Sequence, residues 1–434
     1  MIRLFNLLII TILFHSCSFN ENSKFWSNSK ELVQEENIEF QEIFPKEESL
    51  KKEFNSGLNL KFTSKTTNNT NLNNLLNNDG RLNFDGRLKK RSSYKFSKIK
   101  NFNQYQPEIS FHDNSIIFFD KKGSILKFDN KSKLIWKKNY YSKSEKKLNP
   151  ILQFVNNNSD LIVADNIANY YMLDIKTGNL IWSKNNLAPF NSQIKIYKNK
   201  FFVIDLSNTL RCFSLDNGEE LWNVKTQNSL IRTQKKLSMT IIDNNIYFIN
   251  SIGDISAVDI ESGELLWQLP TQSSLIYESS FSLKNSDLIS DGESLFFSNN
   301  NNQFFSIDID SGSLNWKNKI NSYLRSTIIG DYLVSISLEG YLIILEKKSG
   351  KIIRVTDIFQ NLKKKKRKQI KPVGFVVGLN EIYLSTSNGR LMIINIESGK
   401  TISTIKVDNE KISKPFIQNK NLFLIKNNAI IRLN

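Results

Sequence analysis

The sequence predicts an all-β fold, an eight-bladed β-propeller built from four-stranded antiparallel blades. Three observations lead to this prediction. A segment with the pattern of two strands joined by a tight turn, clearest from Gly253 to Trp267, recurs along most of the chain. The copies lie ~40–50 residues apart, the spacing of propeller blades that contain several short strands each. The last copy is incomplete, and a segment nearer the N-terminus has the alternation needed to complete it.

The clearest copy shows how one repeat encodes two strands and a turn. Apolar residues alternate with small or polar residues from Ile255 to Asp259, as in a strand with one buried face. Asp259 and Ser262 can bond backbone N–H groups and Gly263 can adopt a positive φ, so we expect a tight hairpin turn here. The chain then continues as a second strand to Trp267. An indole on this outer strand is expected to fill the space between neighbouring blades.

Seven copies of the pattern are present. Each is recognised by an acidic or amide residue together with a glycine, a tryptophan or both. In chain order the copies are Gly123, Asp129 and Trp136; Asp174, Gly178 and Trp182; Asp216, Gly218 and Trp222; Asp259, Gly263 and Trp267; Asp308, Gly312 and Trp316; Gly340, Glu346 and Gly350; Gly389, Asn395 and Gly399. Arg354 and Ser403 stand where the last two copies would have the tryptophan. We expect the acids to cap turns rather than to bind a metal ion, because each belongs to a different blade.

An eighth copy is divided between the two ends of the chain. The segment from Asn421 to Asn434 runs up to the acidic position of the repeat and stops before the turn. Tyr94 to Ile99 precedes the first full copy and has strand alternation, so we expect it to pair with the C-terminal strands and close the ring. Closure removes two sheet edges that would otherwise promote aggregation. The propeller is therefore predicted over residues 93–434.

The first 17 residues have the pattern of an export signal. Met1 to Arg3 is positively charged and Leu4 to Phe14 is mostly apolar but too short to cross a bilayer, which takes about 20 residues. Phe14-His15-Ser16-Cys17 resembles a bacterial lipobox, in which Ser16 fits and Phe14 and His15 depart from the usual residues. The resemblance implies that Cys17 is the lipid-attachment site, and Ser18 after it implies delivery to the outer membrane. The alternative is an ordinary secretory signal that contains a cysteine by chance.

Residues 18–92 are predicted to be a tether between the lipid and the ring. The run from Thr66 to Gly80 is rich in Asn and low in complexity, so it cannot bury enough apolar surface to fold by itself, and we expect the tether to be mostly disordered. Within it, Leu50 to Leu60 is a candidate short strand or helix. Gly80 to Leu88 is a candidate segment for folding onto the propeller.

The net charge of +17 has two interpretations. A basic chain often binds nucleic acid or anionic membranes, but export argues against nucleic acid. The lysines are spread over many turns, with one cluster from Lys363 to Lys368. This cluster is either a solvated loop or an electrostatic contact with anionic lipid or an acidic partner.

Catalytic chemistry finds little support in the residue types. His15 leaves with the signal peptide and His112 remains, so neither a Ser-His-Asp set nor a zinc site built from histidines can form. We expect His112 to be a surface turn residue. If Cys17 is acylated, Cys212 has no partner for a disulfide and is expected to be a small buried apolar residue. The sequence therefore predicts no catalytic, cofactor-binding or metal-binding residue, and no cofactor.

The repeat Gly-x-apolar-x-Ala-apolar-Asp-x-x-Thr/Ser-Gly-x-x-x-Trp resembles the PQQ-like propeller repeat, which is specific for fold and weak for function. Eight such blades behind a lipoprotein signal resemble the BamB family of the outer-membrane β-barrel assembly machinery. The resemblance implies a lipoprotein on the periplasmic face of the outer membrane that binds the POTRA domains of BamA. It also implies unfolded outer-membrane proteins as further partners.

The resemblance places the partner-binding residues after the third tryptophan. The family's Leu-Ser-Leu-Arg stretch corresponds to Ser229-Leu230-Ile231-Arg232, which gives Leu230, Ile231 and Arg232 as candidates for the BamA contact. Alternatively, Ile231 belongs to a strand core and Arg232 is an ordinary surface residue. The family's Asp-x-Asp stretch corresponds best to Ser282 to Lys284, so that acidic contact is absent or moved.

Three functions remain open at this point. The first is a non-catalytic scaffold lipoprotein of barrel assembly. The second is a PQQ-dependent dehydrogenase, although such enzymes have an adjacent cysteine pair, calcium ligands and a catalytic Asp in a longer chain. The third is an envelope propeller that binds another periplasmic or cell-wall partner.

Overall fold

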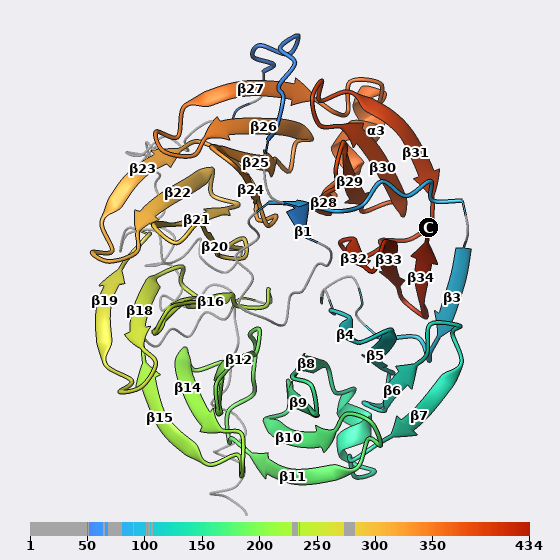
Figure 1. Ribbon diagram of the computed structural model, residues 1–434, viewed down its shortest axis with the longest axis vertical. Helices are drawn as coiled ribbons and strands as arrows, with labels where there is room; N and C mark the ends of the chain where they lie inside the picture. The colour runs from blue at the N-terminus through green and yellow to red at the C-terminus, as the bar shows by residue number, and fades with distance from the viewer. Residues whose placement is uncertain are drawn as a thin grey trace, which may run out of the picture. The chain divides into compact units, whose positions relative to one another are not determined.

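The computed structural model describes residues 50, 52–63, 66–67, 80–89, 91–100, 102, 105, 107–227, 233, 235–272 and 283–434. These residues belong to one compact unit, Glu48–Asn434. Eight four-stranded antiparallel sheets follow one another around a ring (Figure 1), so the predicted eight-bladed propeller is confirmed. Within the ranges described, no helix has the length and apolar character needed to span a membrane.

Each of blades 1 to 4 is made of four consecutive strands, from the innermost to the outermost. Blade 1 contains β4 (Ser110–His112), β5 (Ser115–Phe119), β6 (Ile125–Phe128) and β7 (Leu134–Lys138); blade 2 contains β8 (Leu152–Asn156), β9 (Asp160–Asp165), β10 (Asn169–Asp174) and β11 (Leu180–Asn185); blade 3 contains β12 (Lys195–Tyr197), β13 (Lys200–Ile204), β14 (Thr209–Ser214) and β15 (Glu220–Lys225); blade 4 contains β16 (Met239–Ile242), β17 (Asn245–Ile249), β18 (Ile255–Asp259) and β19 (Leu265–Leu269).

Blades 5 to 7 repeat this order, and blade 8 combines the two ends of the propeller. Blade 5 contains β20 (Ile289–Ser290), β21 (Ser294–Asn299), β22 (Gln303–Asp308) and β23 (Leu314–Asn318); blade 6 contains β24 (Thr327–Ile329), β25 (Tyr332–Ile336), β26 (Tyr341–Glu346) and β27 (Ile352–Asp357); blade 7 contains β28 (Pro372–Val377), β29 (Glu381–Thr386), β30 (Arg390–Asn395) and β31 (Thr401–Lys406); blade 8 contains β32 (Phe416–Gln418), β33 (Asn421–Lys426), β34 (Ala429–Leu433) and β3 (Arg91–Lys95). A short parallel pair, β1 (Thr66–Thr67) and β2 (Arg81–Leu82), lies outside the blades.

Strand β3 closes the ring, as the sequence predicts. It pairs antiparallel with β34, and Tyr94 lies opposite Ile430. The strand begins at Arg91, earlier than the predicted Tyr94, because Arg91 still pairs with Leu433 of β34. After Lys95 the regular pairing ends and isolated backbone hydrogen bonds follow, such as the one from the N–H of Ile99 to the carbonyl of Asn427 at 2.9 Å. Tyr94 is 1% exposed, so closure also buries an aromatic side chain.

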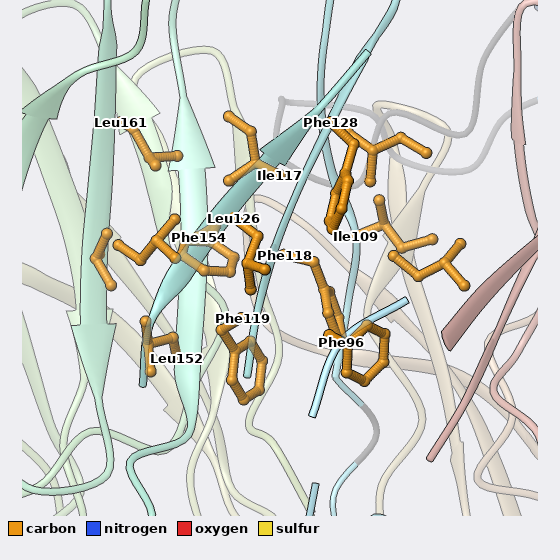
Figure 2. Packing of buried hydrophobic residues seen from close by; sticks show 14 of the residues in the cluster. Phe96, Ile109, Ile117, Phe118, Phe119, Leu126, Phe128, Leu152, Phe154 and Leu161 are labelled. Atoms are coloured by element: carbon orange, nitrogen blue, oxygen red, sulfur yellow. The ribbon is translucent and has the colours of Figure 1, made fainter. Parts of the chain in front are cut away.

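The middle strands of each blade are buried on both faces, whereas the outermost strands are half exposed. Strand β21, for example, has five buried residues in succession, but β15 alternates between exposed and half-buried residues. Apolar clusters fill the space between adjacent blades. In Figure 2, Phe118 and Phe119 of β5 lie between Phe96 and Phe154. The ring centroids of Phe96 and Phe118 are 4.8 Å apart, and those of Phe119 and Phe154 are 6.1 Å apart. Adjacent blades are therefore held together mainly by interlocking apolar side chains.

The tryptophans of the repeat connect each blade to the next. The indole of Trp267 in β19 packs on the turn glycine of blade 5, Gly312, where a Cβ atom would lie 2.5 Å from the ring. Gly312 also has a φ of +70°, so glycine is required there both by conformation and by space. The indole N–H of Trp267 donates a hydrogen bond of 3.0 Å to the carbonyl of Ile309 in the same turn. The predicted role of the tryptophan between blades is confirmed.

The same carbonyl of the turn accepts a donor from the preceding blade at seven junctions. We call it the junction carbonyl. It belongs to the first residue after the third strand of a blade, except in blade 1, where it belongs to the second residue after that strand, Asn130. Tryptophan is the donor at four junctions, and lysine or arginine at three. The pairs are Lys127 to Ile175, Trp182 to Leu215, Trp222 to Ile260, Trp267 to Ile309, Trp316 to Lys347, Arg354 to Ile396 and Arg432 to Asn130.

Arg354 takes the place of the missing tryptophan in blade 6. Its guanidinium is completely buried and donates to the carbonyls of Ile396 at 2.8 Å, Leu58 at 2.9 Å and Glu397. Burial lowers the pKa of Arg354 to about 10, which still leaves it charged at neutral pH. Because Leu58 precedes the propeller, Arg354 attaches an N-terminal segment to the ring as well as one blade to the next.

Parts of the predicted tether lie against the blades. Phe54 pairs with Val355 of β27 through two backbone hydrogen bonds of 3.1 and 2.8 Å. Leu60 and Phe62 are buried in the core between blades 6 and 7. Phe84 is 1% exposed and packs edge-to-face on Tyr383, with ring centroids 5.0 Å apart. These stretches bury aromatic and aliphatic side chains against the blades, so they gain enough apolar burial to be ordered.

Truncation of the indole tests the junction between blades 4 and 5. We expect Trp267→Ala to lower the free energy of unfolding by about 3 kcal/mol, because it opens a cavity over Gly312 and leaves the Ile309 carbonyl without its donor. Trp267→Phe keeps most of the ring surface and should cost about 1 kcal/mol. Urea unfolding of the three proteins measures both values, and a loss below about 1 kcal/mol for Trp267→Ala would show that the indole does not hold the blades together.

Substitution of Arg354 tests the mixed junction. Arg354→Met should lower the free energy of unfolding by roughly 2–4 kcal/mol, because three carbonyls lose their donor. Arg354→Lys retains a charged donor and should cost less. Limited proteolysis provides a second measurement: the segment around Leu58 should become cleavable in Arg354→Met while the propeller remains resistant. Equal stability of wild type and Arg354→Met would contradict the assigned role.

Candidate functional site

The acidic residues of the repeat cap turns. The carboxylate of Asp259 accepts bonds from the N–H of Ser262 at 2.7 Å and from its hydroxyl at 2.8 Å. Asp308 binds Ser311 in the same way, at 2.8 and 2.7 Å. These bonds from the serine lower the pKa of each aspartate. The acids therefore satisfy backbone donors in their own turns, as expected from the sequence.

The third blade corrects one assignment of the repeat. Asp216 was predicted at the capping position from the sequence, but Ser214 occupies it. The N–H of Gly218 bonds to the carbonyl of Ser214, just as that of Gly178 bonds to the carbonyl of Asp174 in blade 2. Asp216 lies in the middle of the turn and accepts a bond from Asn199 instead. The assignment was wrong because an acid close to a turn glycine looks the same in sequence at either position.

The two residues considered for reactivity are both structural. Cys212 is completely buried in β14, and burial raises the pKa of its thiol to about 12, so the thiolate is not formed at neutral pH. The imidazole of His112 lies 3.1 Å from the carbonyl of Asn158, at the edge of blade 1. In the described ranges, no three or more His, Cys, Asp or Glu side chains are grouped so that they could hold a metal ion.

The four site residues predicted from the sequence, Cys17, Leu230, Ile231 and Arg232, lie outside the described part of the chain. The residues that follow the two family contact stretches are described, however. Thr233 and Leu283 are both buried, and the hydroxyl of Thr233 donates to the carbonyl of Leu283 at 3.1 Å. The connection from blade 3 to blade 4 and the connection from blade 4 to blade 5 thus meet at their C-terminal ends.

The basic cluster forms a short helix, α3 (Lys364–Gln369), between blades 6 and 7. Arg367 is held by an ion pair with Asp357 and lies 5.1 Å from the centre of the Tyr341 ring. The lysines on either side are exposed. One of the six basic residues is therefore structural, and the others form a solvated positive surface.

A second charged feature surrounds the axis of the ring. Figure 1 shows that the first strand of each blade, β4, β8, β12, β16, β20, β24, β28 and β32, lies nearest the axis. The strand pairing defines one equivalent position in every blade, which we call the axial position. In blade 1, Ile117 is the third residue of the second strand and pairs with Ser110 of the inner strand; the axial residue, Glu108, lies two residues before Ser110. The residues at this axial position, in blade order, are Glu108, Gln153, Gln193, Ser238, Asp287, Arg325, Gly374 and Lys414.

Ion pairs connect these positions across the ring. The carboxylate of Glu108 in blade 1 binds the ammonium groups of Lys236, next to blade 4, and of Lys414 in blade 8, the latter at 2.6 Å. Lys414 also lies 3.6 Å from Asp287 of blade 5, and Lys235 lies 3.7 Å from the same residue. Blades on opposite sides of the ring are therefore linked through charged side chains.

We define the axial cluster as Glu108, Lys195, Lys235, Lys236, Asp287, Arg325 and Lys414. Gly374 makes room for it, because a Cβ atom there would lie 2.4 Å from the Cβ of Lys414. The side chains of the ion-paired members are only 11–20% exposed. Such burial weakens solvent screening and strengthens every charge interaction in the cluster.

Burial and neighbouring charges shift the pKa values of the cluster. Burial alone would raise the pKa of Glu108, but Lys236 and Lys414 outweigh it and hold the pKa at about 2. Burial, together with the nearby positive charge of Arg325, lowers the pKa of Lys195 to about 7. Burial also lowers the pKa of Lys235 to about 8. The carboxylates are thus stabilised as anions, whereas two lysines resist protonation.

The axial cluster was not predicted from the sequence, in which the lysines are dispersed and only the run from Lys363 to Lys368 stands out. An alignment of the repeats on their second strands could have found it, because a polar or charged residue then stands at the axial position in seven of the eight blades. Which of these residues meet across the ring depends on their rotamers and is not encoded locally.

The pH dependence of stability tests the role of Glu108. Its pKa in the folded protein is about 2 against an ordinary value of 4.5, so its contribution is fully present above pH 4.5 and is lost as the pH falls towards 2. Glu108→Gln should therefore be less stable than wild type at pH 7, by about 3 kcal/mol at most. Urea unfolding at pH 7, 4 and 2.5 should show this gap shrinking with acidification. A gap that is constant over this range would contradict the assignment.

The comparisons with known proteins agree with the geometry. The sequence matches the model of the family described as outer membrane protein assembly factor BamB over residues 121–356, more than half of the chain. A comparison with curated proteins found no match. Among solved structures, BamB from Moraxella catarrhalis is similar with a TM-score of 0.62 and 16% sequence identity, over 79% of this chain and 100% of that one.

Two enzymes share the fold. The quinohemoprotein alcohol dehydrogenase from Comamonas testosteroni gives a TM-score of 0.60 at 9% identity, over 82% of this chain and 78% of the enzyme. A europium-containing methanol dehydrogenase gives 0.59 at 11% identity, over 81% and 88%. At such identities structural likeness shows the fold alone. The sequence match is more specific, and by it the chain belongs to the family of outer membrane protein assembly factor BamB.

Proposed function

We propose that this protein is a non-catalytic scaffold lipoprotein of the outer-membrane β-barrel assembly machinery. In this role its propeller binds the POTRA domains of BamA and assists the delivery and insertion of barrel proteins, with unfolded outer-membrane proteins as further partners. The observation that carries the proposal is the family match, which extends from blade 1 to blade 6 of the ring. A scaffold needs a rigid body with a defined contact surface, and the junctions between blades provide the rigidity.

The proposed contact with BamA uses Leu230, Ile231 and Arg232. An apolar side chain beside an arginine is typical of interface hot spots. Support comes from the bond between Thr233 and Leu283, because it joins the ends of the two connections that correspond to the family's contact stretches. A partner that touches both connections would then bind one continuous surface.

The proposed anchor is a diacylated Cys17 that follows a signal peptide at residues 1–17. One such cysteine carries enough acyl chain for stable attachment to the periplasmic face of the outer membrane. Residues 18–92 would connect the lipid to the propeller at 93–434. The buried side chains of Leu60, Phe62 and Phe84 imply that the connection remains attached to the ring in part of its length.

Two other functions remain as alternatives. The exposed lysines of α3 would suit an envelope propeller that binds a different, acidic partner or anionic lipid. A PQQ-dependent dehydrogenase is the weaker alternative. The chain contains only two cysteines, Cys17 and Cys212, which are not adjacent, so it departs from the cysteine pair of that class. Addition of quinone and calcium followed by absorbance spectroscopy of the purified protein separates this alternative from the scaffold.

An affinity pull-down from detergent-solubilised envelopes tests the proposed partner. We expect wild type to recover BamA and the double variant Ile231→Ala, Arg232→Glu to lose at least about 90% of it, because a hot spot of 1.4 kcal/mol or more corresponds to tenfold in affinity. The matched control is Ile402→Ala with Lys400→Glu, at two exposed residues beside the start of β31 in blade 7, which likewise truncates an apolar side chain and reverses a basic charge far along the ring. It should recover BamA like wild type.

The other outcomes are equally informative. Recovery of BamA by both variants would keep the scaffold function and eliminate the proposed contact residues. Failure of wild type to recover BamA would contradict the scaffold function and favour a different envelope partner. Circular dichroism of each variant excludes misfolding as the cause of a loss.

A further inference from the structure

The rim of blade 6 binds an extended segment of this chain's own N-terminal part. The N–H of Phe54 donates to the carbonyl of Val355 at 3.1 Å, and the N–H of Val355 donates to the carbonyl of Phe54 at 2.8 Å. Val355 belongs to β27, an outermost strand at the rim of the ring (Figure 1), so Phe54 is added antiparallel to the edge of the sheet. Addition of an extended segment to a sheet edge is a general mode of peptide recognition.

The added segment also covers apolar side chains of the rim. Ile352 and Ile353 of β27 are half-buried, and Leu50 packs against the same apolar cluster as Ile352. Val355, which belongs to this cluster, is completely buried. The side-chain amide of Asn55 adds a bond of 3.3 Å to the carbonyl of Ile353. The segment therefore supplies both backbone hydrogen bonds and apolar burial to this edge.

Strand β19 of blade 4 has the same edge in an exposed form. Leu265, Leu266 and Gln268 stand where β27 has its two isoleucines and its valine, because both strands have the same register and bulge relative to their third strands. The leucines are 43% and 47% exposed, and Gln268 is exposed. In an antiparallel ladder with this register, the backbone N–H and C=O of Gln268 point away from β18. Within the described ranges, these two groups have no backbone partner outside their own sheet.

The edge of β19 also lacks the charge that normally protects a rim. Lysine on an edge strand discourages pairing with another chain. The structure describes all eight outermost strands, and seven of them contain a charged residue, whereas β19 reads Leu-Leu-Trp-Gln-Leu. Blades 1 and 5 even have a lysine, Lys137 and Lys317, at the position of Gln268. The rim is therefore least protected against an added strand at β19.

We propose that the outer edge of β19 binds an extended peptide segment in which apolar and polar residues alternate, as in an unfolded strand of a membrane β-barrel protein. The peptide adds a fifth strand to blade 4 through the backbone of Gln268, and its apolar side chains cover Leu265 and Leu266. Alternation suits this edge because one face of the added strand extends the apolar rim while the other faces water. The proposal rests on the proposed function, since it specifies how the ring holds one class of its partners.

Fluorescence polarisation of the full-length protein in detergent with a labelled synthetic peptide tests the edge. In the probe, Phe and Leu alternate with Thr and Asn, and lysines at both ends exclude simple attraction to the basic protein. We expect saturable binding. The same peptide methylated at every backbone nitrogen should bind at least about tenfold more weakly, because it keeps its side chains but loses its ladder donors. Equal binding of both peptides, or no saturable binding, would overturn the proposal.

Two substitutions of Gln268 separate its backbone from its side chain. Gln268→Pro should weaken peptide binding by at least about fivefold, because it removes the outward N–H and its ring obstructs the edge. Gln268→Ala is the matched control. It loses the same side chain, including the bond to Asp254, but keeps the N–H, and should bind within about twofold of wild type. Equal losses in the two variants would contradict a strand that is added through the backbone.

A charge at an exposed leucine provides a second test that does not depend on proline being tolerated. Leu266→Lys should weaken peptide binding by at least about fivefold, because it places on β19 the kind of residue that protects other edges. Ile181→Lys makes a comparable change at the equivalent position of β11, where the side chain is 49% exposed. It should leave the affinity unchanged. An equal loss would mean that binding follows net charge or any rim strand, and would overturn the proposal.

Two further measurements separate other occupants of the edge. Sedimentation velocity reports self-association: a wild-type dimer that Leu266→Lys abolishes would mean that a second copy occupies the edge, and would overturn the proposal. In the envelope pull-down, Leu266→Lys should recover BamA like wild type. Loss of BamA without loss of peptide binding would overturn the proposal. Peptide binding by a wild type that recovers no BamA would support the edge of β19 and contradict the scaffold function alone.

Discussion

The junction carbonyl is the constraint on which the rest of the ring depends. Every propeller blade is a twisted sheet that must bury both faces against its neighbours, and apolar packing alone fixes neither the height nor the rotation of one blade relative to the next. A directional hydrogen bond from the preceding blade to one carbonyl of the turn fixes both. Four junctions use a tryptophan for this purpose, and its indole also covers the turn glycine.

The three exceptions show that the donor matters more than the residue type. Lys127 reaches the junction carbonyl of Ile175, although Trp136 still packs on Gly178. Arg354 replaces the tryptophan of blade 6 and binds an N-terminal segment at the same time. Arg432 serves the junction at which the ring closes. Long cationic side chains can substitute for the indole because they combine an apolar stem with a donor at the tip.

Regular junctions also explain why charges meet at the axis. When each blade is related to the next by a similar rotation, equivalent residues at or near the start of the inner strands form a circle around the axis. In this chain Glu108 bridges lysines from two distant blades, whereas Gly374 provides space for one of them. The axial cluster therefore arises from the repeat geometry together with sequence differences between the blades.

The repeat itself could be predicted from sequence because its signals are local. The spacing from turn glycine to tryptophan, and the missing turn after Leu433, were enough to predict eight blades and the closing strand. The role of Arg354 could not be predicted, because its partner Leu58 lies 296 residues away. Asp216 was misassigned because Ser214 can start a turn equally well. The axial cluster was missed because each blade contributes only one or two ordinary polar residues to it.

The central claim is that this ring acts as a scaffold through the connection between blades 3 and 4. The most direct measurement places a photoreactive amino acid at position 231 in the full-length protein and identifies its adducts in intact envelopes. The same substitution at Ile181, which is 49% exposed on the outer strand of blade 2, serves as the reference. The account predicts an adduct with BamA from position 231 and none from position 181. Adducts with other proteins alone, or equal BamA adducts from both positions, would contradict it.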